Sequence, residues 1–135
     1  MNLVSLRVIT HDVAHLVDFY ERVTGVRADW STEDFAELRT ASGTLAIGST
    51  RTVPLFAPGS ARPADNRSVI IEFLVDDVDA VHRNLAGLVT EFVKEPTTMP
   101  WGNRALLFRD PDGNLVNLFT PVTPAAIGKF AGSAR

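Results

Sequence analysis

The chain has 135 residues, 45% of them hydrophobic, which is enough apolar material for one compact structural domain. It has no cysteine, which excludes a disulfide framework, a thiolate nucleophile and a sulfur-ligated zinc site, and fits a reducing compartment. The net charge of −3 is scattered, so a nucleic-acid-binding surface is not expected. Neither a signal peptide nor the run of about 18 apolar residues that spans a membrane is present, so we expect a cytoplasmic chain with no membrane partner.

The first part of the chain predicts a strand, a helix and then three more strands. Residues Leu3–Ile9 alternate in the manner of a strand, and apolar residues recur at helical spacing over His11–Val23. Gly25 follows and can supply the left-handed residue that ends the helix. The order is that of one βαβββ unit. Its three later strands are expected at Arg27–Trp30, Phe35–Thr40 and Thr44–Ser49.

The same order of elements returns after residues 53–66, which hold three prolines and one glycine and have the composition of a linker. A strand is predicted over Ser68–Val75, and either Asp76 or Asp77 can cap a helix that runs to about residue 85. Proline and glycine in the sequence Asp-Pro-Asp-Gly predict a tight hairpin before the last strand. The later strands are expected at Thr90–Val93, Asn103–Arg109 and Asn114–Thr120, with a loop over residues 95–102.

The two halves are related by an internal repeat. Arg7 precedes the first helix start, Asp12, by five residues, and Glu72 precedes Asp77 by the same distance. Such a repeat predicts a duplicated module within one structural domain. We place the first module at residues 1–52, the linker at 53–66, the second module at 67–121 and a tail at 122–135. The tail is rich in small residues and proline, and we expect it to fray or to pack on a partner surface.

Three local motifs occur in a characteristic order. They are Asp12 leading to Phe19-Tyr20 and Gly25, Phe73-Leu74-Val75-Asp76-Asp77, and Phe108 to Asn117 through the turn Asp110-Pro111-Asp112-Gly113. Together they resemble the vicinal-oxygen-chelate superfamily, which includes glyoxalases, bleomycin resistance proteins and extradiol dioxygenases. The resemblance covers residues 2–121 and implies an α+β fold of two tandem βαβββ modules, whose curved mixed sheets form a cleft.

Enzymes of that superfamily hold a divalent metal on four strands, and the chain departs from their pattern at all four positions. The resemblance assigns these positions to Ser5, Ile47, Ile70 and Asn117. Two aliphatic side chains, a hydroxyl and an amide cannot offset the dehydration of a hard divalent cation. His11 and His15 stand four residues apart at a helix start, but we expect them on the surface. We therefore predict neither a metal nor another cofactor.

Strand alternation divides the predicted strands into a helix-facing side and a cleft side. Ser5 and Arg7 fall on the cleft side of the first module, and Ile70 and Glu72 on that of the second. A buried lone charge is costly, so Arg7 and Glu72 are expected to pair with each other or with opposite charges on a ligand. Trp101, in the predicted loop, can stack on a flat ligand. The full set of predicted ligand-binding residues is Ser5, Arg7, Ile47, Ile70, Glu72, Trp101, Asn117 and Phe119.

The functional hypothesis is a metal-free protein that sequesters or senses a small organic ligand, such as an antibiotic or an aromatic metabolite. The resemblance also implies a homodimer. The alternative is a lyase, isomerase or dioxygenase with a relocated active site, in which Arg7 would act as an electrophile and Glu72 as a general base. A third alternative is a regulatory or structural subunit with a vestigial cleft that binds nothing.

Overall fold

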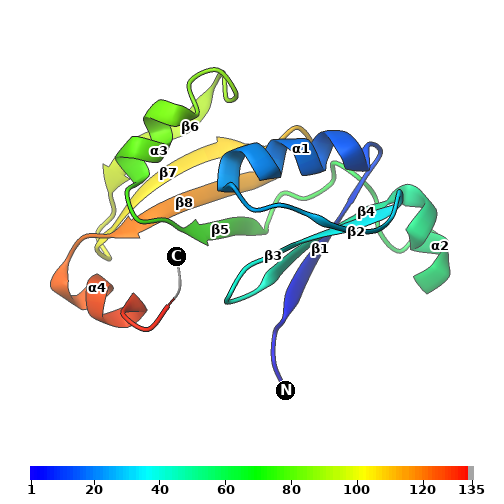
Figure 1. Ribbon diagram of the computed structural model, residues 1–135, viewed down its shortest axis with the longest axis horizontal. Helices are drawn as coiled ribbons and strands as arrows, with labels where there is room; N and C mark the ends of the chain where they lie inside the picture. The colour runs from blue at the N-terminus through cyan, green and yellow to red at the C-terminus, as the bar shows by residue number, and fades with distance from the viewer. Residues whose placement is uncertain (134–135) are drawn as a thin grey trace. The chain divides into compact units, whose positions relative to one another are not determined.

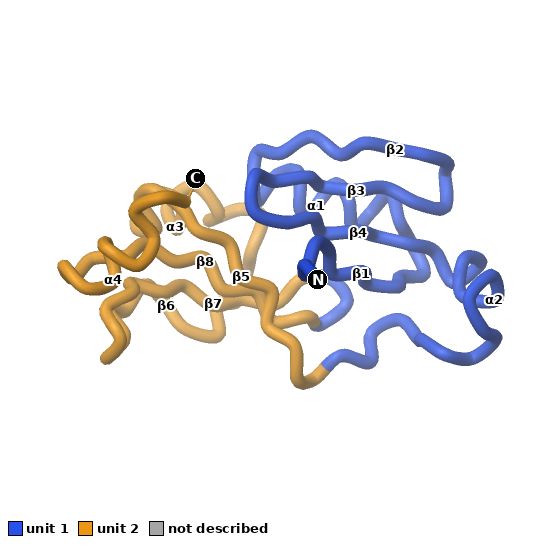
Figure 2. Tube along the Cα trace, turned by 90° about the horizontal axis from the view of Figure 1, so that it is seen from below, with its two compact units in different colours: residues 1–66, 111–113 blue, residues 67–110, 114–135 orange. Residues whose placement is uncertain are grey.

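The computed structural model describes residues 1–133 and contains two four-stranded mixed sheets with helices (Figure 1). The chain divides into two compact units (Figure 2). Unit 1 comprises residues 1–66 and 111–113, and unit 2 comprises residues 67–110 and those from 114 onwards. Each unit contains one βαβββ module, so the predicted α+β class with tandem modules is confirmed. No helix in residues 1–133 is long and apolar enough to cross a membrane.

Unit 1 contains the first sheet, in the strand order β1-β4-β3-β2. Its elements are β1 (Ser5–Thr10), α1 (Val13–Thr24), β2 (Asp29–Thr32), β3 (Phe35–Arg39), β4 (Thr44–Ser49), the short 3-10 helix η1 (Thr50–Thr52) and α2 (Val53–Phe56). β1 pairs with β4 in parallel, while β3 pairs with both β4 and β2 antiparallel. A parallel pair needs a long crossover connection, and α1 supplies it.

Helix α1 is fixed at both ends and along one face. The Asp12 side chain accepts a hydrogen bond from the His15 backbone N–H at 3.0 Å, which satisfies a donor that the first turn leaves open. Gly25 ends the helix at a φ of 73°, as predicted. Leu16 and Tyr20 belong to its buried stripe, which packs against the sheet. Because α1 occupies one side of the sheet, the other side carries no helix of this crossover.

Unit 2 repeats the arrangement, with the strand order β5-β8-β7-β6. Its elements are β5 (Ile70–Leu74), α3 (Val78–Asn84), β6 (Phe92–Thr98), β7 (Asn103–Arg109), β8 (Leu115–Pro121) and α4 (Pro124–Phe130). β5 pairs with β8 in parallel, and the other two pairs are antiparallel. Of the two predicted caps, Asp77 is the one used, since its side chain accepts from the Ala80 N–H at 3.1 Å. The predicted hairpin turn is also present, with Gly113 at a φ of 82°.

The chain path differs from the expected one over residues 95–102 and has helices in the linker and in the tail. β6 extends to Thr98, so the expected loop over residues 95–102 is a strand followed by a tight turn. Pro96 does not end β6, because this is an edge strand and its register shifts at that point. Residues 53–56, expected to be linker, form α2 with Pro54 in its first turn. In the tail, Thr123 caps α4, and the Phe130 ring lies 5.3 Å from that of Phe119.

The turn between β6 and β7 depends on Gly102. Its φ is 92°, and an added Cβ would overlap the Thr123 hydroxyl and lie 3.1 Å from the Ala126 Cβ. Gly102→Ala is therefore expected to lower the free energy of unfolding by about 2 kcal/mol or more. Urea denaturation measures this change. Gly87→Ala is the control, since nothing lies within 4 Å of the added methyl group. Equal effects of the two substitutions would contradict the account.

Arg104 on β7 holds α3 through a two-pronged ion pair with Asp79, at 2.7 and 2.9 Å. The Arg104 hydrogen bonds hold the pKa of Asp79 below its ordinary value. The pair's stabilisation is therefore present above the unfolded pKa of about 3.9 and is lost as pH falls through the lower folded pKa. Because Asp79 is partly exposed, Asp79→Asn should cost at most about 1 kcal/mol near pH 7.

Thermal unfolding of the two proteins across pH tests this expectation. The difference in midpoint between wild type and Asp79→Asn should be constant near neutrality and shrink below about pH 4. Asp65→Asn, which breaks a more exposed pair with Arg62, should have a smaller effect throughout. A difference that grows as the pH falls would refute the assignment.

Candidate binding surface

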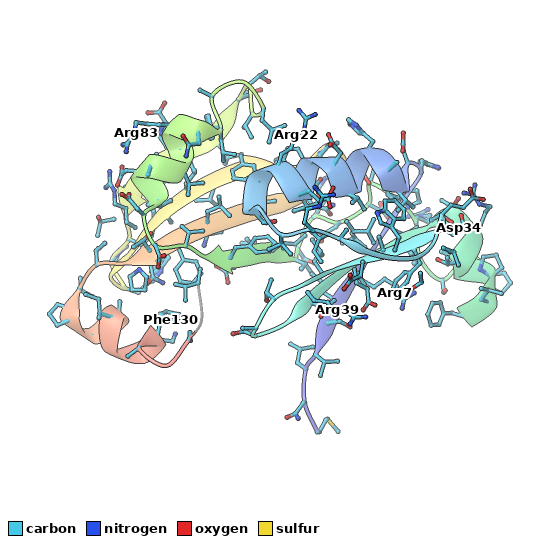
Figure 3. The ribbon with its side chains drawn as sticks, in the orientation of Figure 1. Arg7, Arg22, Asp34, Arg39, Arg83 and Phe130 are labelled. Carbon is cyan, nitrogen blue, oxygen red and sulfur yellow. The ribbon has the colours of Figure 1, made fainter. Side chains whose placement is uncertain are left out.

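The sheet of unit 1 presents Arg7 on the face opposite α1. Arg7 pairs with Ala46 of β4, which in turn pairs with Glu37 of β3. Residues paired across neighbouring strands share a face, so the three form one row. Figure 3 shows Arg7 and Arg39 on the side of the sheet away from α1. We call this side of the unit 1 sheet, with the residues of α2 that contact Arg7, the Arg7 face.

The Arg7 side chain reaches across β4 to aromatic rings. Its Cζ lies 4.4 Å from the ring centroid of Phe35 on β3 and 5.0 Å from that of Phe56 on α2. Between Arg7 and the rings, the intervening strand carries Ala46 and Gly48 on this face, and neither obstructs the guanidinium. A Cβ on Gly48 would lie 3.0 Å from the Thr52 hydroxyl, which is tighter than ordinary contact. The Arg7 side chain therefore crosses two small residues of β4 on its way to the rings, and Gly48 also leaves room for Thr52.

Charge pairing on this face is uneven. Arg39 lies 3.1 Å from Glu37 and 3.6 Å from Asp29, so the two carboxylates share one arginine as their ion-pair partner. Within unit 1, all of whose residues are described, Arg7 has no carboxylate partner and its contacts are with the two rings. Cation–π contacts at exposed sites contribute roughly 0.5–1 kcal/mol each and leave the positive charge in place. Arg7 is thus the arginine of this face that has no ion-pair partner within its own unit.

A polar cluster in unit 1 fixes the segment that carries Phe56. The Asp34 carboxylate accepts from Arg51 Nε at 2.7 Å and from the Ser49 hydroxyl at 2.8 Å. The Arg51 hydrogen bond, followed by that of Ser49, lowers the pKa of Asp34, so this carboxylate stays charged at neutral pH. Arg51 belongs to η1, which leads directly into α2. Sequence reasoning missed this cluster, because its two charged members are 17 residues apart.

The corresponding face of unit 2 carries Glu72 and Asn117, which are paired across β5 and β8. Asn117 Nδ2 donates to Glu72 Oε2 at 2.8 Å. The reverse amide orientation would set an oxygen against the carboxylate, so this assignment is the favourable one. Asn117 Oδ1 is buried and accepts no hydrogen bond from the described residues. Phe119 is on the same face by alternation, but Phe130 of α4 packs against its ring.

The structure brings some of the predicted site residues together. Ser5 and Arg7 share a face of β1, and Ile70 and Glu72 share the face of β5 that is paired with Asn117. Arg7 and Glu72 belong to different units, so their mutual pairing stays a prediction. His11 and His15 are exposed, and residues 1–133 hold no cluster of three His, Cys, Asp or Glu residues suited to a metal.

Two residues are not where the sequence placed them. Ile47 pairs with Val8 and is 0% exposed, so it lies in the core beneath α1 and not on the Arg7 face. The prediction counted four residues from the turn at Gly43. The parallel register with β1 instead places Ala46 beside Arg7, on the Arg7 face. Trp101 does not lie in a long loop. It occupies the tight turn between β6 and β7 and is 67% exposed.

Comparisons with known proteins agree with this architecture. The family model of the Glyoxalase/Bleomycin resistance protein/Dioxygenase superfamily matches residues 2–118. The chain therefore belongs to this superfamily, as the sequence motifs indicated.

Individual relatives are distant. A glyoxalase/bleomycin resistance protein/dioxygenase from Nocardioides is similar in structure, with a TM-score of 0.73 and 22% identity over 92% of this chain and 85% of that one. A family enzyme from Burkholderia phytofirmans PsJN has a TM-score of 0.78 and 19% identity, over 90% and 100% of the two chains. The uncharacterized protein YraH of Bacillus subtilis (strain 168) is 22% identical over 125 residues, 88% of this chain and 98% of that protein. These likenesses bear on the fold alone.

The Asp34 cluster generates a testable prediction about the mobility of α2. Asp34→Asn removes the charge that holds Arg51, so amide hydrogen exchange over residues 52–56 should accelerate several-fold, with little change in helix α1. Glu33→Gln, at the neighbouring position of the same turn, is the control and should leave the exchange rates unaltered. Unchanged exchange in Asp34→Asn would show that the cluster does not fix α2.

Proposed function

We propose that this protein binds a small organic molecule without a metal, and so sequesters or senses it. The observation that supports this most is chemical. The strand positions that the superfamily's enzymes use for metal ligands carry a hydroxyl, a methyl group, an aliphatic chain and an amide. With the β4 position corrected, these residues are Ser5, Ala46, Ile70 and Asn117. The side chain of Ala46, like that of Ile47, has no lone pair with which to bind a metal ion. The reason for predicting a metal-free protein therefore still holds.

The same faces carry groups suited to an organic ligand. Small-molecule sites combine apolar and aromatic walls with a few oriented polar groups. The Arg7 face offers one guanidinium beside Phe35 and Phe56, and unit 2 offers Glu72 held by Asn117. Arg7 and Glu72 are therefore the proposed polar anchors. Ser5 and Ile70 are proposed as neighbours on the same strands, and Trp101 and Phe119 as further contacts of the ligand.

A homodimer is also part of the proposal. β1 and β5 are edge strands, and each exposes apolar side chains. Val4, just before β1, is 66% exposed, and Ile70 on β5 is 47% exposed. Apolar residues along an unpaired strand edge favour association with another chain. Sedimentation equilibrium would test this, and a monomer at all concentrations would remove the dimer without affecting ligand binding.

Thermal unfolding of metal-stripped protein tests the proposed function, because a ligand that prefers the folded state raises the unfolding midpoint. One series receives Mn, Fe, Ni or Zn ions, and the other a library of antibiotics and aromatic metabolites. At a ligand concentration of about 100 times Kd, the stabilisation is about 2.7 kcal/mol, which is a rise of several degrees. We expect such a rise with organic compounds and none with the ions.

Two results would contradict the proposal. Stabilisation by one ion at equimolar amounts would indicate a metalloenzyme whose ligands lie elsewhere. Consumption of a stabilising compound, followed by chromatography, would favour the alternative of a lyase, isomerase or dioxygenase over sequestration. Binding that saturates with the compound recovered intact supports the binding protein.

A further inference from the structure

We propose that the ligand docks on the Arg7 face through a carboxylate attached to a flat aromatic body, with Arg7 as the anion-binding residue. The inference rests on the proposed function, because it names the ligand class for one of the two faces described above. Three features of unit 1 carry it: the distribution of charge, the free edges of the Arg7 guanidinium, and the exposed ring of Phe56.

The pattern of ion pairs leaves Arg7 as the group of this face that an anion would bind. Four charged residues follow the rows of this face, and Arg39 lies close to both acidic ones, Asp29 and Glu37. The remaining charge is that of Arg7, which has no carboxylate partner within unit 1. A cationic ligand would meet this unpaired guanidinium, whereas an anionic one would pair with it. The guanidinium carries one charge, as a carboxylate does, whereas a phosphate monoester carries nearly two.

The guanidinium is available for a two-pronged hydrogen bond. It is planar, with five N–H donors directed outward in its plane. No side-chain N–H of Arg7 donates a hydrogen bond within unit 1, and its aromatic contacts restrict the side chain to the space above β4. A carboxylate matches two parallel donors of such a fork, and these charge-assisted pairs are about twice as strong as neutral hydrogen bonds. Holding the side chain in place also reduces the entropy lost when a ligand binds.

The aromatic body of the ligand has a surface to rest on. Phe56 is 69% exposed although its ring lies 5.0 Å from Arg7 Cζ, so most of the ring is open beside the anion-binding group. The neighbouring Leu55 is 85% exposed on the same short helix. An aromatic pair contributes roughly 0.5–1.5 kcal/mol beyond the area it buries. A flat carboxylate could therefore pair with Arg7 at one end and stack on Phe56 with its ring.

Isothermal titration of the full chain with 2-naphthoate and with 2-naphthamide tests the inference. The two probes share the ring system and differ in charge. We expect naphthoate to bind at least about tenfold more tightly than the amide, as for removal of a charge-assisted pair. Arg7→Gln should abolish that preference, and Arg7→Lys should retain only part of it, because lysine keeps the charge but lacks the planar fork. Phe56→Ala should weaken both probes by similar factors.

The matched control is Arg22→Gln, the same substitution on the side of α1 (Figure 3). Arg22 is an exposed residue of unit 1 paired with Asp18, and its loss changes the net charge by the same amount. The control should keep the preference for naphthoate. Both arginine variants are checked by thermal unfolding, and since Arg7 is exposed we expect both to remain folded.

The results separate this inference from the proposed function. Equal binding of acid and amide, no binding of either, or a preference that survives in Arg7→Gln overturns the carboxylate assignment. The proposed function fails only if, in addition, no compound of the wider library stabilises the metal-stripped protein. A neutral or cationic compound that stabilises it through residues of unit 2 would retain the function and reject the inference.

Discussion

The parallel pairing of β1 with β4, and of β5 with β8, is the constraint on which the rest of each unit depends. Parallel neighbours cannot be joined by a hairpin, so a helix must cross between them and cover one face of the sheet. The opposite face, which this helix does not cover, carries alternate strand residues, such as Arg7 and Phe35 in unit 1 and Ile70 and Glu72 in unit 2. Because side chains alternate, the register of these pairs decides which residues each face receives. In unit 1 it places Arg7, Ala46 and Glu37 in one row and buries Ile47 beneath α1.

From that register follows the unusual state of Arg7. A long cationic side chain on an edge strand reaches the centre of the face only because Ala46 and Gly48 leave β4 without bulk. The Arg7 guanidinium contacts the rings of Phe35 and Phe56. The nearby carboxylates, Asp29 and Glu37, form ion pairs with Arg39. The equivalent row of unit 2 carries a carboxylate instead of a guanidinium, and the Asn117 side-chain amide donates a hydrogen bond to that carboxylate, Glu72. The two modules thus keep one architecture and have opposite charges at equivalent positions, Arg7 and Glu72.

Much of the fold could be predicted from local chemistry. The helix start at Asp12, the Gly25 cap and the strands at residues 44–49 and 103–109 were predicted correctly, since each depends on neighbouring residues. Asp77 is one of the two caps that the sequence allowed. The errors arose where the pairing of strands that are distant in the sequence determines the structure. Ile47 was misplaced because strand register is not local, and Pro96 fits within β6 only because that strand is at an edge. For the candidate site, Arg7, Glu72 and Asn117 were found by alternation. Phe56 and Asp34 were missed, because a linker composition conceals a helix and an ion pair across 17 residues leaves no periodic signal.

The most direct test of the central claim is the NMR signal of the Arg7 side-chain Nε–H in the unliganded protein, followed from about pH 7 to about pH 4, where carboxylates titrate. The account predicts a proton shifted upfield by the ring currents of Phe35 and Phe56, and a position that does not follow the titration of any carboxyl group. A downfield signal that moves with a carboxyl titration would show that Arg7 is ion-paired, with Glu72 as the first candidate. Arg7 would then be a structural residue and not the free anion-binding group described above.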